Sequence, residues 1–276
     1  MSLLQLQAAQ FRLYLDPAAR DSLRRGDRSL AVDFSLNETE FDQLRRMVVD
    51  QAAGIATFAN MLVRKRDDRL AQYYPMVKRY LGSAWQARID AFVRRWPIPA
   101  VSAAEDAVAF GEHLAGWNVD DADQGIAADL IVFERTKAEV AADSRPGGAA
   151  PPCDLRQPKE IKPVLAPTAR IRTLRHHPNR LVDLVMSHSA TALEPPPNGV
   201  VVVFFCGTGG LGVAASEVGA WLAAVLQKAD GHSTLDEIVC ALGMGDDPSV
   251  IETLSSVLER LREIGMIELW PAGSAS

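Results

Sequence analysis

The stretch from Gly199 to Trp270 most constrains what this chain can fold into. Val200 to Cys206 is rich in β-branched and aromatic residues, which favours a strand. A glycine-rich turn and a second short strand follow, then three segments with apolar residues at helical spacing. Met266 to Trp270 closes the pattern as a further strand. This order predicts a small winged-helix-like unit, a fold that binds partners more often than it catalyses reactions.

The boundaries of the three helices carry local signals. Ser216 is expected to cap the first helix, and Thr234 with Glu237 forms a capping box for the second. Gly265 is expected to end the third helix, which buries a long apolar face. That face consists of Val250, Ile251, Leu254, Val257, Leu258, Leu261 and Ile264. The C-terminal part therefore combines a small antiparallel sheet with three helices.

The first half of the chain is predicted to be helical, which makes the whole protein α+β. Asn37 and Glu40 form a capping box, and apolar residues from Phe41 to Leu62 follow at steps of three and four, as in one continuous helix. The charged cluster Arg64 to Arg69 is expected to end that stripe in solvent. Residues 143–168, rich in proline with two adjacent glycines, predict a linker between a domain at 1–142 and one at 169–276.

Charge and composition exclude several classes of protein. The formal net charge is -6, so no global attraction to nucleic acid or an acidic membrane is expected. The three cysteines are scattered, which fits a reducing cytoplasm rather than a disulfide framework. No signal peptide is evident, and the run at 199–205 is too short to span a membrane. We therefore expect a cytoplasmic protein that binds neither nucleic acid nor membrane.

Motifs that carry chemistry are weak in this chain. Gly207, Gly209 and Gly212 fit the spacing of a dinucleotide-binding turn, but no second parallel strand follows, which favours a hairpin turn. The five histidines form no metal-ligand pair, and His176-His177 is expected to be solvated or hydrogen-bonded. No histidine is placed beside Cys206 or Cys240. We expect no catalytic residue, no metal site and no cofactor in this chain.

The third helix raises the alternative of a DNA-binding regulator, because winged helices often insert a helix in the major groove. Its polar face carries Glu252, Glu259 and Glu263 beside two arginines, which is unfavourable for contacts to phosphates. An autonomous metalloenzyme is a third alternative. A strand edge beside a long helix is the better candidate, because it can accept an extended peptide as an added strand.

Two groups of motifs resemble one family. The C-terminal stretches Gly231 to Ile238 and Leu258 to Ile267 resemble the PqqD-like peptide-recognition element of ribosomal peptide natural-product pathways. The second group lies in the N-terminal half and consists of Tyr74-Pro75, Leu81-Gly82, Trp85, Ala128-Asp129-Leu130 and Phe133-Glu134. These motifs resemble the helical domain of partner proteins of the HvfC, MbnC and TglI family.

The resemblance implies a non-catalytic subunit that pairs with a TIM-barrel enzyme of the TglH, MbnB or HvfB type. The multinuclear non-haem iron centre belongs to that enzyme, and the subunit binds a precursor peptide and delivers its cysteine to the iron. The two-domain length is more similar to the TglI and HvfC branches than to MbnC. In the TglI branch, the complex removes the cysteine β-carbon during 3-thiaglutamate biosynthesis.

On this basis, residues 1–142 are expected to dock on the enzyme and residues 169–276 to bind the peptide. Backbone pairing is expected along the strand from Val200 through Val201, Val202 and Val203, and an apolar groove at Leu254, Leu258 and Leu261. Arg170 and Arg172, with Arg175, are expected to meet an acidic peptide. The residues expected to dock on the enzyme are Tyr74, Pro75, Trp85, Phe133 and Glu134.

Overall fold

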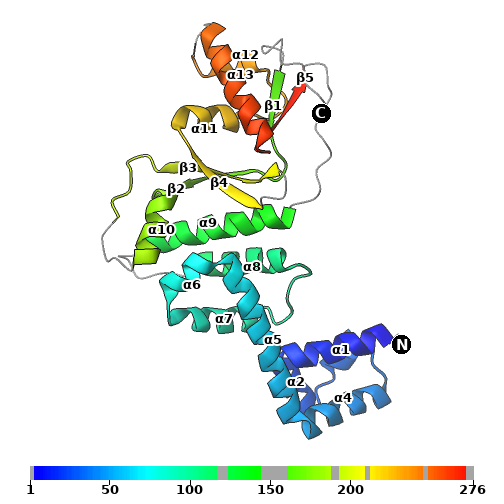
Figure 1. The fold of residues 1–276 in the computed structure, drawn as a ribbon. Coiled ribbons are helices and arrows are strands. Elements are labelled where there is room, and N and C mark those ends of the chain that lie inside the picture. Colours follow the sequence, from blue (N-terminus) through cyan, green and yellow to red (C-terminus); the bar gives the residue numbers. More distant parts are fainter. Residues whose placement is uncertain are drawn as a thin grey trace. The chain divides into compact units, whose positions relative to one another are not determined.

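A computed structural model describes residues 3–116, 124–143, 161–187, 193–208, 212–244 and 248–271. The chain divides into two compact units, Met1–Asp106 and Ala107–Ser276. The first is helical and the second mixes helices with two small antiparallel sheets (Figure 1). The α+β prediction is therefore confirmed. The structural division falls before the proline-rich stretch at 143–168, and each unit is described by itself below.

The N-terminal unit contains seven complete helices and the start of an eighth within its described residues. They are α1 (Leu3–Leu15), α2 (Pro17–Arg24), α3 (Ser29–Asp33), α4 (Glu38–Asp50), α5 (Ala52–Tyr73), α6 (Pro75–Leu81), α7 (Ala84–Arg95) and the first turn of α8 (Ala103–Ala115). No helix in the described ranges is long and apolar enough to cross a membrane.

The core of the first five helices follows the sequence pattern closely. The predicted capping box is confirmed at α4, where Asn37 accepts from the backbone of Glu40 and the Glu40 carboxylate accepts from the backbone of Asn37. The prediction of one helix from Phe41 to Leu62 is wrong, because the chain bends at Gln51 between α4 and α5. The bend brings Val48 and Ile55 into one core with α1 and α2.

Arg66 corrects a second expectation, that residues 64–69 all lie in solvent. Its guanidinium is buried and forms a two-pronged ion pair with Asp106, with Nε–Oδ2 and Nη2–Oδ1 distances of 2.8 and 2.6 Å. It also donates to the carbonyl of Trp96 and lies over the ring of Phe92. All three guanidinium nitrogens have an acceptor and one face lies over an aromatic ring, so the buried charge is paired.

The C-terminal unit follows α8 in the chain. Its elements are α9 (Gln124–Asp143), β1 (Ile161–Leu165), β2 (Arg170–Leu174), α10 (Pro178–Ser187), β3 (Val200–Cys206), β4 (Val213–Val218), α11 (Ala220–Gln227), α12 (Leu235–Ala241), α13 (Pro248–Glu263) and β5 (Ile267–Pro271). Residues 209–211 of the glycine-rich turn lie outside the described residues.

The larger sheet has the strand order β2-β3-β4 and is antiparallel throughout. Helix α9 lies along one of its faces, and α11–α13 lie on the other side (Figure 1). Val202 and Phe204 face α9, where Phe133 packs edge-on against Phe204 at a ring-centroid distance of 5.2 Å. Val203 and Phe205 belong to the core shared with the three helices. The strand is hydrophobic on both faces because both faces are covered.

The smaller sheet pairs β1 with β5. Strand β1 lies at the end of the range 143–168 that we expected to be a linker, which corrects that boundary. Pro163 is compatible with a strand here because its carbonyl accepts from Gly231, on the side away from β5. The missing N–H of the proline therefore removes no hydrogen bond from the β1–β5 ladder.

The helix boundaries in this unit are mostly as predicted. Thr234 and Glu237 form the expected capping box, and α13 ends at Gly265, with φ +84° and the backbone N–H of Met266 bonded to the carbonyl of Leu261. This is a Schellman ending, in which glycine accepts the left-handed conformation readily. Ser216 does not cap a helix, because it lies within β4 and α11 begins after Gly219.

Candidate functional site

The structure changes the position at which an added strand can pair. Strand β3, which includes the predicted contacts Val200, Val201, Val202 and Val203, is the central strand of its sheet. Antiparallel neighbours run along both of its sides. Its backbone groups are therefore already used, and the expectation of peptide pairing at these four residues is corrected. The sheet can be extended only at its outer strands, β2 and β4.

Strand β4 presents an open edge. Gly207 donates to the carbonyl of Gly212 in the hairpin, so by alternation the backbone groups of Val213, Ala215 and Glu217 point away from β3. Within the described residues, no backbone hydrogen bond to these three residues comes from outside their own sheet. These three alternate residues offer an extended peptide a row of backbone donors and acceptors along the strand.

The edges of the smaller sheet carry features that discourage pairing. The outer side of β1 is covered, because Leu165 donates to Ala229 and Gly231 donates to Pro163. The backbone groups of Ile267 and Leu269 in β5 are directed away from β1, but the strand ends at Pro271. The sequence of β4, VAASEV, contains neither proline nor lysine, and its register with β3 is unbroken. Proline, lysine and bulges are the usual protection of natural edges, so β4 is less protected than β1 and β5.

The side chains along β4 are small. Ala214 is partly buried against the core of the unit, and Ala215 on the opposite face is exposed. Glu217 is the one charged residue of the strand, and its carboxylate lies 3.1 Å from Nδ1 of His177. An incoming strand therefore meets little steric obstruction, and the single carboxylate of the strand already has the imidazole of His177 beside it.

The predicted groove on α13 is not open. Leu254 and Leu258 are buried in the core of the unit, and Leu261 is only partly accessible. The end of α13 does lie beside the β3–β4 hairpin, because Thr208 Oγ1 donates to the carbonyl of Glu263 at 2.9 Å. The helix is adjacent to the sheet as expected, but its apolar face stabilises the fold.

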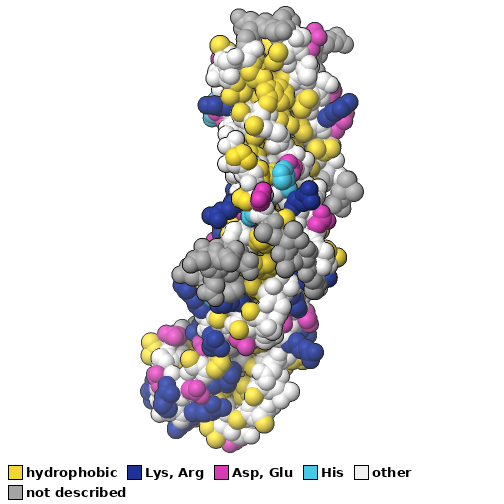
Figure 2. All heavy atoms as spheres, turned by 90° about the vertical axis from the view of Figure 1, so that its left-hand side faces the viewer, with side chains coloured by type: hydrophobic (Ala, Val, Ile, Leu, Met, Phe, Trp, Pro, Cys, Tyr) yellow, Lys and Arg dark blue, Asp and Glu magenta, His cyan; other side chains and the backbone are white. Residues whose placement is uncertain are grey.

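Accessible apolar side chains occur instead on the helices before α13. Figure 2 shows hydrophobic side chains gathered over the upper part of the view, at the height of α11–α13 in Figure 1. Trp221 on α11 is exposed, and its Nε1 lies 3.2 Å from Sδ of Met244. Leu222 and Leu242 are partly buried beside them. These side chains were not among the predicted contacts, since their exposure depends on how the three helices pack.

The predicted arginines of β2 already have acidic partners. Arg172 Nη2 lies 2.7 Å from Oε2 of Glu139, and Arg170 pairs with Asp143, both on α9. Glu139 also accepts from Arg135 at 2.9 Å. These contacts hold β2 against α9, so an acidic peptide would have to compete with carboxylates of the same unit.

The predicted docking residues are mostly interior. Tyr74, Trp85 and Glu134 are buried, and Phe133 packs against the sheet. Pro75 alone is exposed, at the first position of α6. Trp85 has a structural role, since its indole Nε1 donates to Asp67 at 2.7 Å. The motifs that carry this second resemblance fall in both structural units, and they mostly stabilise the fold rather than form a continuous surface.

A buried polar cluster at the end of β2 escaped the sequence analysis. Asp129 on α9 accepts the backbone N–H groups of Arg175 and His176, and its Oδ2 lies 2.8 Å from Nδ1 of His176. Both side chains are buried. The signal was Asp129 as the one charged residue at positions 124–133 of α9, and its partner lies 47 residues further along the chain. The cluster connects α9 to the end of β2, and its members are a carboxylate, an imidazole and backbone N–H groups.

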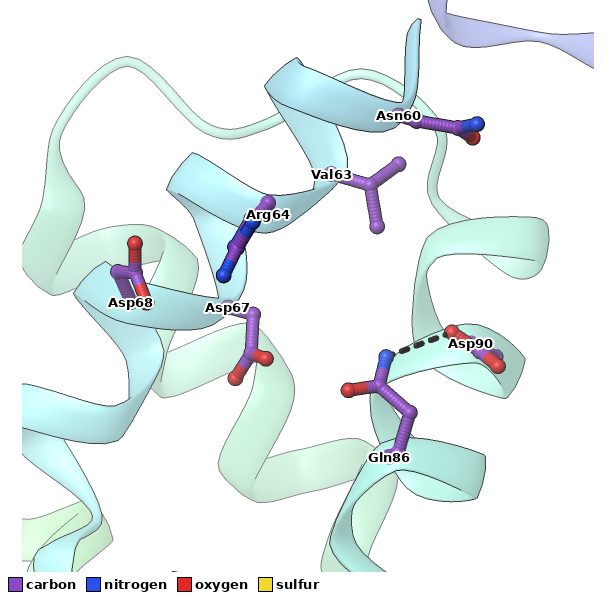
Figure 3. Close-up of a pocket in the computed structure, with 7 residues that line it drawn as sticks. All are labelled: Asn60, Val63, Arg64, Asp67, Asp68, Gln86 and Asp90. Atoms are coloured by element: carbon purple, nitrogen blue, oxygen red, sulfur yellow. Dashed lines mark hydrogen bonds between the residues drawn. The ribbon is translucent and has the colours of Figure 1, made fainter. Parts of the chain in front are cut away.

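A polar pocket of about 480 Å³ lies between α5 and α7 in the N-terminal unit (Figure 3). It is lined by Asn60, Val63, Arg64, Asp67, Asp68, Gln86 and Asp90. Gln86 Nε2 donates to Asp90 at 3.0 Å, and Asp67 accepts from Trp85. Two of its three carboxylates are thus engaged in contacts within the unit. In the described parts of the chain, no group of three or more His, Cys, Asp or Glu residues is arranged to hold a metal ion.

Comparison with known families gives one partial match. A model of the SCO6045-like C-terminal domain matches residues 50–116, which include α5–α8 and the pocket between α5 and α7. No curated protein matches the chain in sequence. The similarity is thus confined to a helical segment and does not include either sheet.

Proposed function

We propose that this chain is a non-catalytic subunit that binds a ribosomally made precursor peptide and presents its cysteine to a TIM-barrel multinuclear iron oxygenase. The observation that carries the peptide-binding part is the open edge of β4. The enzyme partner comes from the motif resemblance to the HvfC, MbnC and TglI family. Iron is held by the partner in this proposal, and this chain supplies the contacts that position the substrate.

The peptide adds to the β2-β3-β4 sheet as a fourth strand. Its backbone pairs with the outward groups of Val213, Ala215 and Glu217, which supplies affinity without a special side chain. Alternate side chains of an extended peptide point to opposite faces of the sheet. Selectivity then comes from the surroundings of β4, including the carboxylate of Glu217 and the imidazole of His177.

The branch of the family and the product form the finer part of the proposal. The two-domain length favours the TglI or HvfC branch, and within the TglI branch the complex excises the cysteine β-carbon on the route to 3-thiaglutamate. The PqqD-like stretch Gly231 to Ile238 leads into α12, and Leu258 to Ile267 runs from the end of α13 into β5. These stretches build the scaffold that carries the candidate edge.

A proline substitution at the open edge tests the peptide site. Ala215→Pro removes a donor that points away from β3, so the internal ladder is kept. The loss of one intermolecular hydrogen bond, with the clash of the ring against an incoming strand, is expected to weaken binding by about tenfold or more. Fluorescence anisotropy measures the affinity for labelled synthetic peptides that represent candidate precursors among the neighbouring genes.

The matched control is Thr173→Pro, which removes an outward donor from β2 on the opposite edge. This variant is expected to bind the peptide as the wild type does. Equal weakening by both variants would contradict the choice of β4. Sequence-specific retention of genomic fragments in a gel shift, with no peptide binding, would instead support the DNA-binding alternative.

A further inference from the structure

An exposed apolar surface on the N-terminal unit has no role in the peptide site. We define the α1–α5 surface as Leu4 and Phe11 on α1 with Phe58 and Met61 on α5. Their exposed fractions are 73%, 43%, 39% and 42%. Helix α1 meets α5 near its own C-terminal end and crosses it at an angle (Figure 1), and the ring centroids of Tyr14 on α1 and Phe58 on α5 lie 4.9 Å apart. The four side chains therefore belong to neighbouring helices joined by an aromatic contact.

The two helices are unusually poor in charge where they form this surface. Helix α1 contains one charged residue, Arg12, which pairs with Asp16 just beyond the helix. Residues 52–63 of α5 contain no charged residue. A helix at the surface of a protein normally carries charged side chains on its solvent face. A scarcity of charged residues together with exposed aromatic and methionine side chains is typical of the centre of a protein–protein interface.

Positive charge begins where the apolar segment of α5 ends. Arg64, Lys65 and Arg69 are exposed on the following turns, and Asp68 is the one exposed carboxylate among them. Lys65 follows Met61 by four residues and so lies on the same side of the helix. The surface therefore has an apolar centre and a basic border at one end.

We propose that the α1–α5 surface docks the partner enzyme through an apolar patch that is bordered by carboxylates on the enzyme. This inference rests on the proposed function, and it replaces the buried residues Tyr74 and Trp85 as the docking site. Pairing of two copies through this same surface is disfavoured, because neither α1 nor residues 52–63 carry a carboxylate to meet the basic border. Complementary charge at the border favours a partner of opposite sign.

Co-expression of this chain with its neighbouring genes, among which the proposed function places the TIM-barrel iron enzyme, tests the proposal. The tagged chain is captured, and the enzyme retained with it is quantified. The double variant Phe11→Glu, Met61→Glu is expected to retain at least tenfold less enzyme, because two carboxylates enter the apolar centre. Val101→Glu is the control, since Val101 is 103% exposed in the same unit but lies outside both helices.

Lys65→Glu provides a second variant that leaves the packing of the unit unchanged. It is expected to reduce retention several-fold at low ionic strength, with a smaller effect at high salt, because the border contact is electrostatic. Thermal melts and peptide anisotropy are expected to match the wild type for every variant. These two readouts separate a docking defect from misfolding and from loss of the peptide site.

The outcomes distinguish the two proposals. Retention by both surface variants at the wild-type level overturns the docking surface and leaves the proposed function standing. Failure of the wild-type chain to retain the enzyme overturns both. Light scattering gives a further test. If the wild-type chain is a dimer and the double variant is a monomer, the docking proposal is also overturned, because the surface then binds a second copy of this chain.

Discussion

The two sheets of the C-terminal unit differ in whether their outer strands are protected from pairing with another strand. The β1–β5 pair is short and contains Pro163 and Pro271, and the loop at 229–231 bonds along the outer side of β1. In the β2-β3-β4 sheet, β2 is held to α9 by Arg170 and Arg172, whereas β4 ends the sheet with small side chains and three outward backbone positions. The difference shows that strand content does not define a peptide site, since only an unprotected edge can accept another strand.

The centre of the larger sheet should tolerate change least. Phe204→Ala is expected to lower the free energy of unfolding by about 3–5 kcal/mol, because a fully buried ring against Phe133 is replaced by a cavity. Urea denaturation measures the change. Phe204→Leu keeps much of the volume and should cost clearly less. A small effect of the alanine variant would mean that α9 does not stabilise this sheet.

The polar cluster that connects α9 to β2 should have the next largest effect. Asp129→Ala leaves two backbone donors and the His176 imidazole without their acceptor, at a cost of about 3 kcal/mol. Glu217→Ala, which removes the exposed partner of His177, should cost about 1 kcal/mol or less. Thermal or chemical denaturation of both variants compares the buried and the exposed histidine contacts. Equal losses would contradict the distinction.

The protected edge of β1 depends on a glycine. Gly231 has φ +78°, and a Cβ at this position would lie 2.9 Å from Cγ2 of Val164. Gly231→Ala is expected to destabilise the protein by about 1–2 kcal/mol, from the left-handed conformation and the contact with Val164. Adding Val164→Ala should recover part of the loss by removing the contact. Full recovery would show that backbone conformation contributes nothing here.

The smallest expected effect concerns pH at the same loop. The backbone N–H of His232, with that of Ser233, holds the pKa of the Asp230 carboxyl below its usual value. Because the folded-state pKa is depressed, the stabilisation is present above the unfolded-state pKa and is lost as the pH falls through the folded-state value. Asp230→Asn removes this titration while keeping an acceptor. The difference in stability between the two proteins should be constant near neutral pH and shrink below about pH 4, as followed by urea denaturation.

Much of the local structure was predictable because its signals lie within a few residues. The capping boxes at Asn37 and Thr234 and the stop at Gly265 are each set by side chains or backbone angles inside one turn. The strand at 200–206 was equally clear from its β-branched and aromatic residues. The bend at Gln51 was missed because the apolar spacing continues across it and only the packing of α4 and α5 on α1 and α2 shows the break.

The candidate site was predictable only in kind. An open strand edge beside a helix was expected. Strand β3 has the strongest strand signal in the sequence, but it is the central strand because β2 and β4 flank it. Strand β1 resembled a linker, since its partner β5 lies about a hundred residues further along the chain. Side chains expected to bind, such as Leu254 and Trp85, share their apolar character with core residues, so sequence does not distinguish the two roles.

The sequence by itself determined the fold class, the caps and the sites where helices end, because these follow from interactions between residues close in the chain. Tertiary structure decided which strand has an open edge, that Arg66 is buried against Asp106, and that the apolar residues of α1 and α5 remain exposed. Each of these depends on partners 40 or more residues away, or on the absence of a covering element among the described residues. Burial and pairing are properties of the packed chain, and local pattern constrains them only weakly.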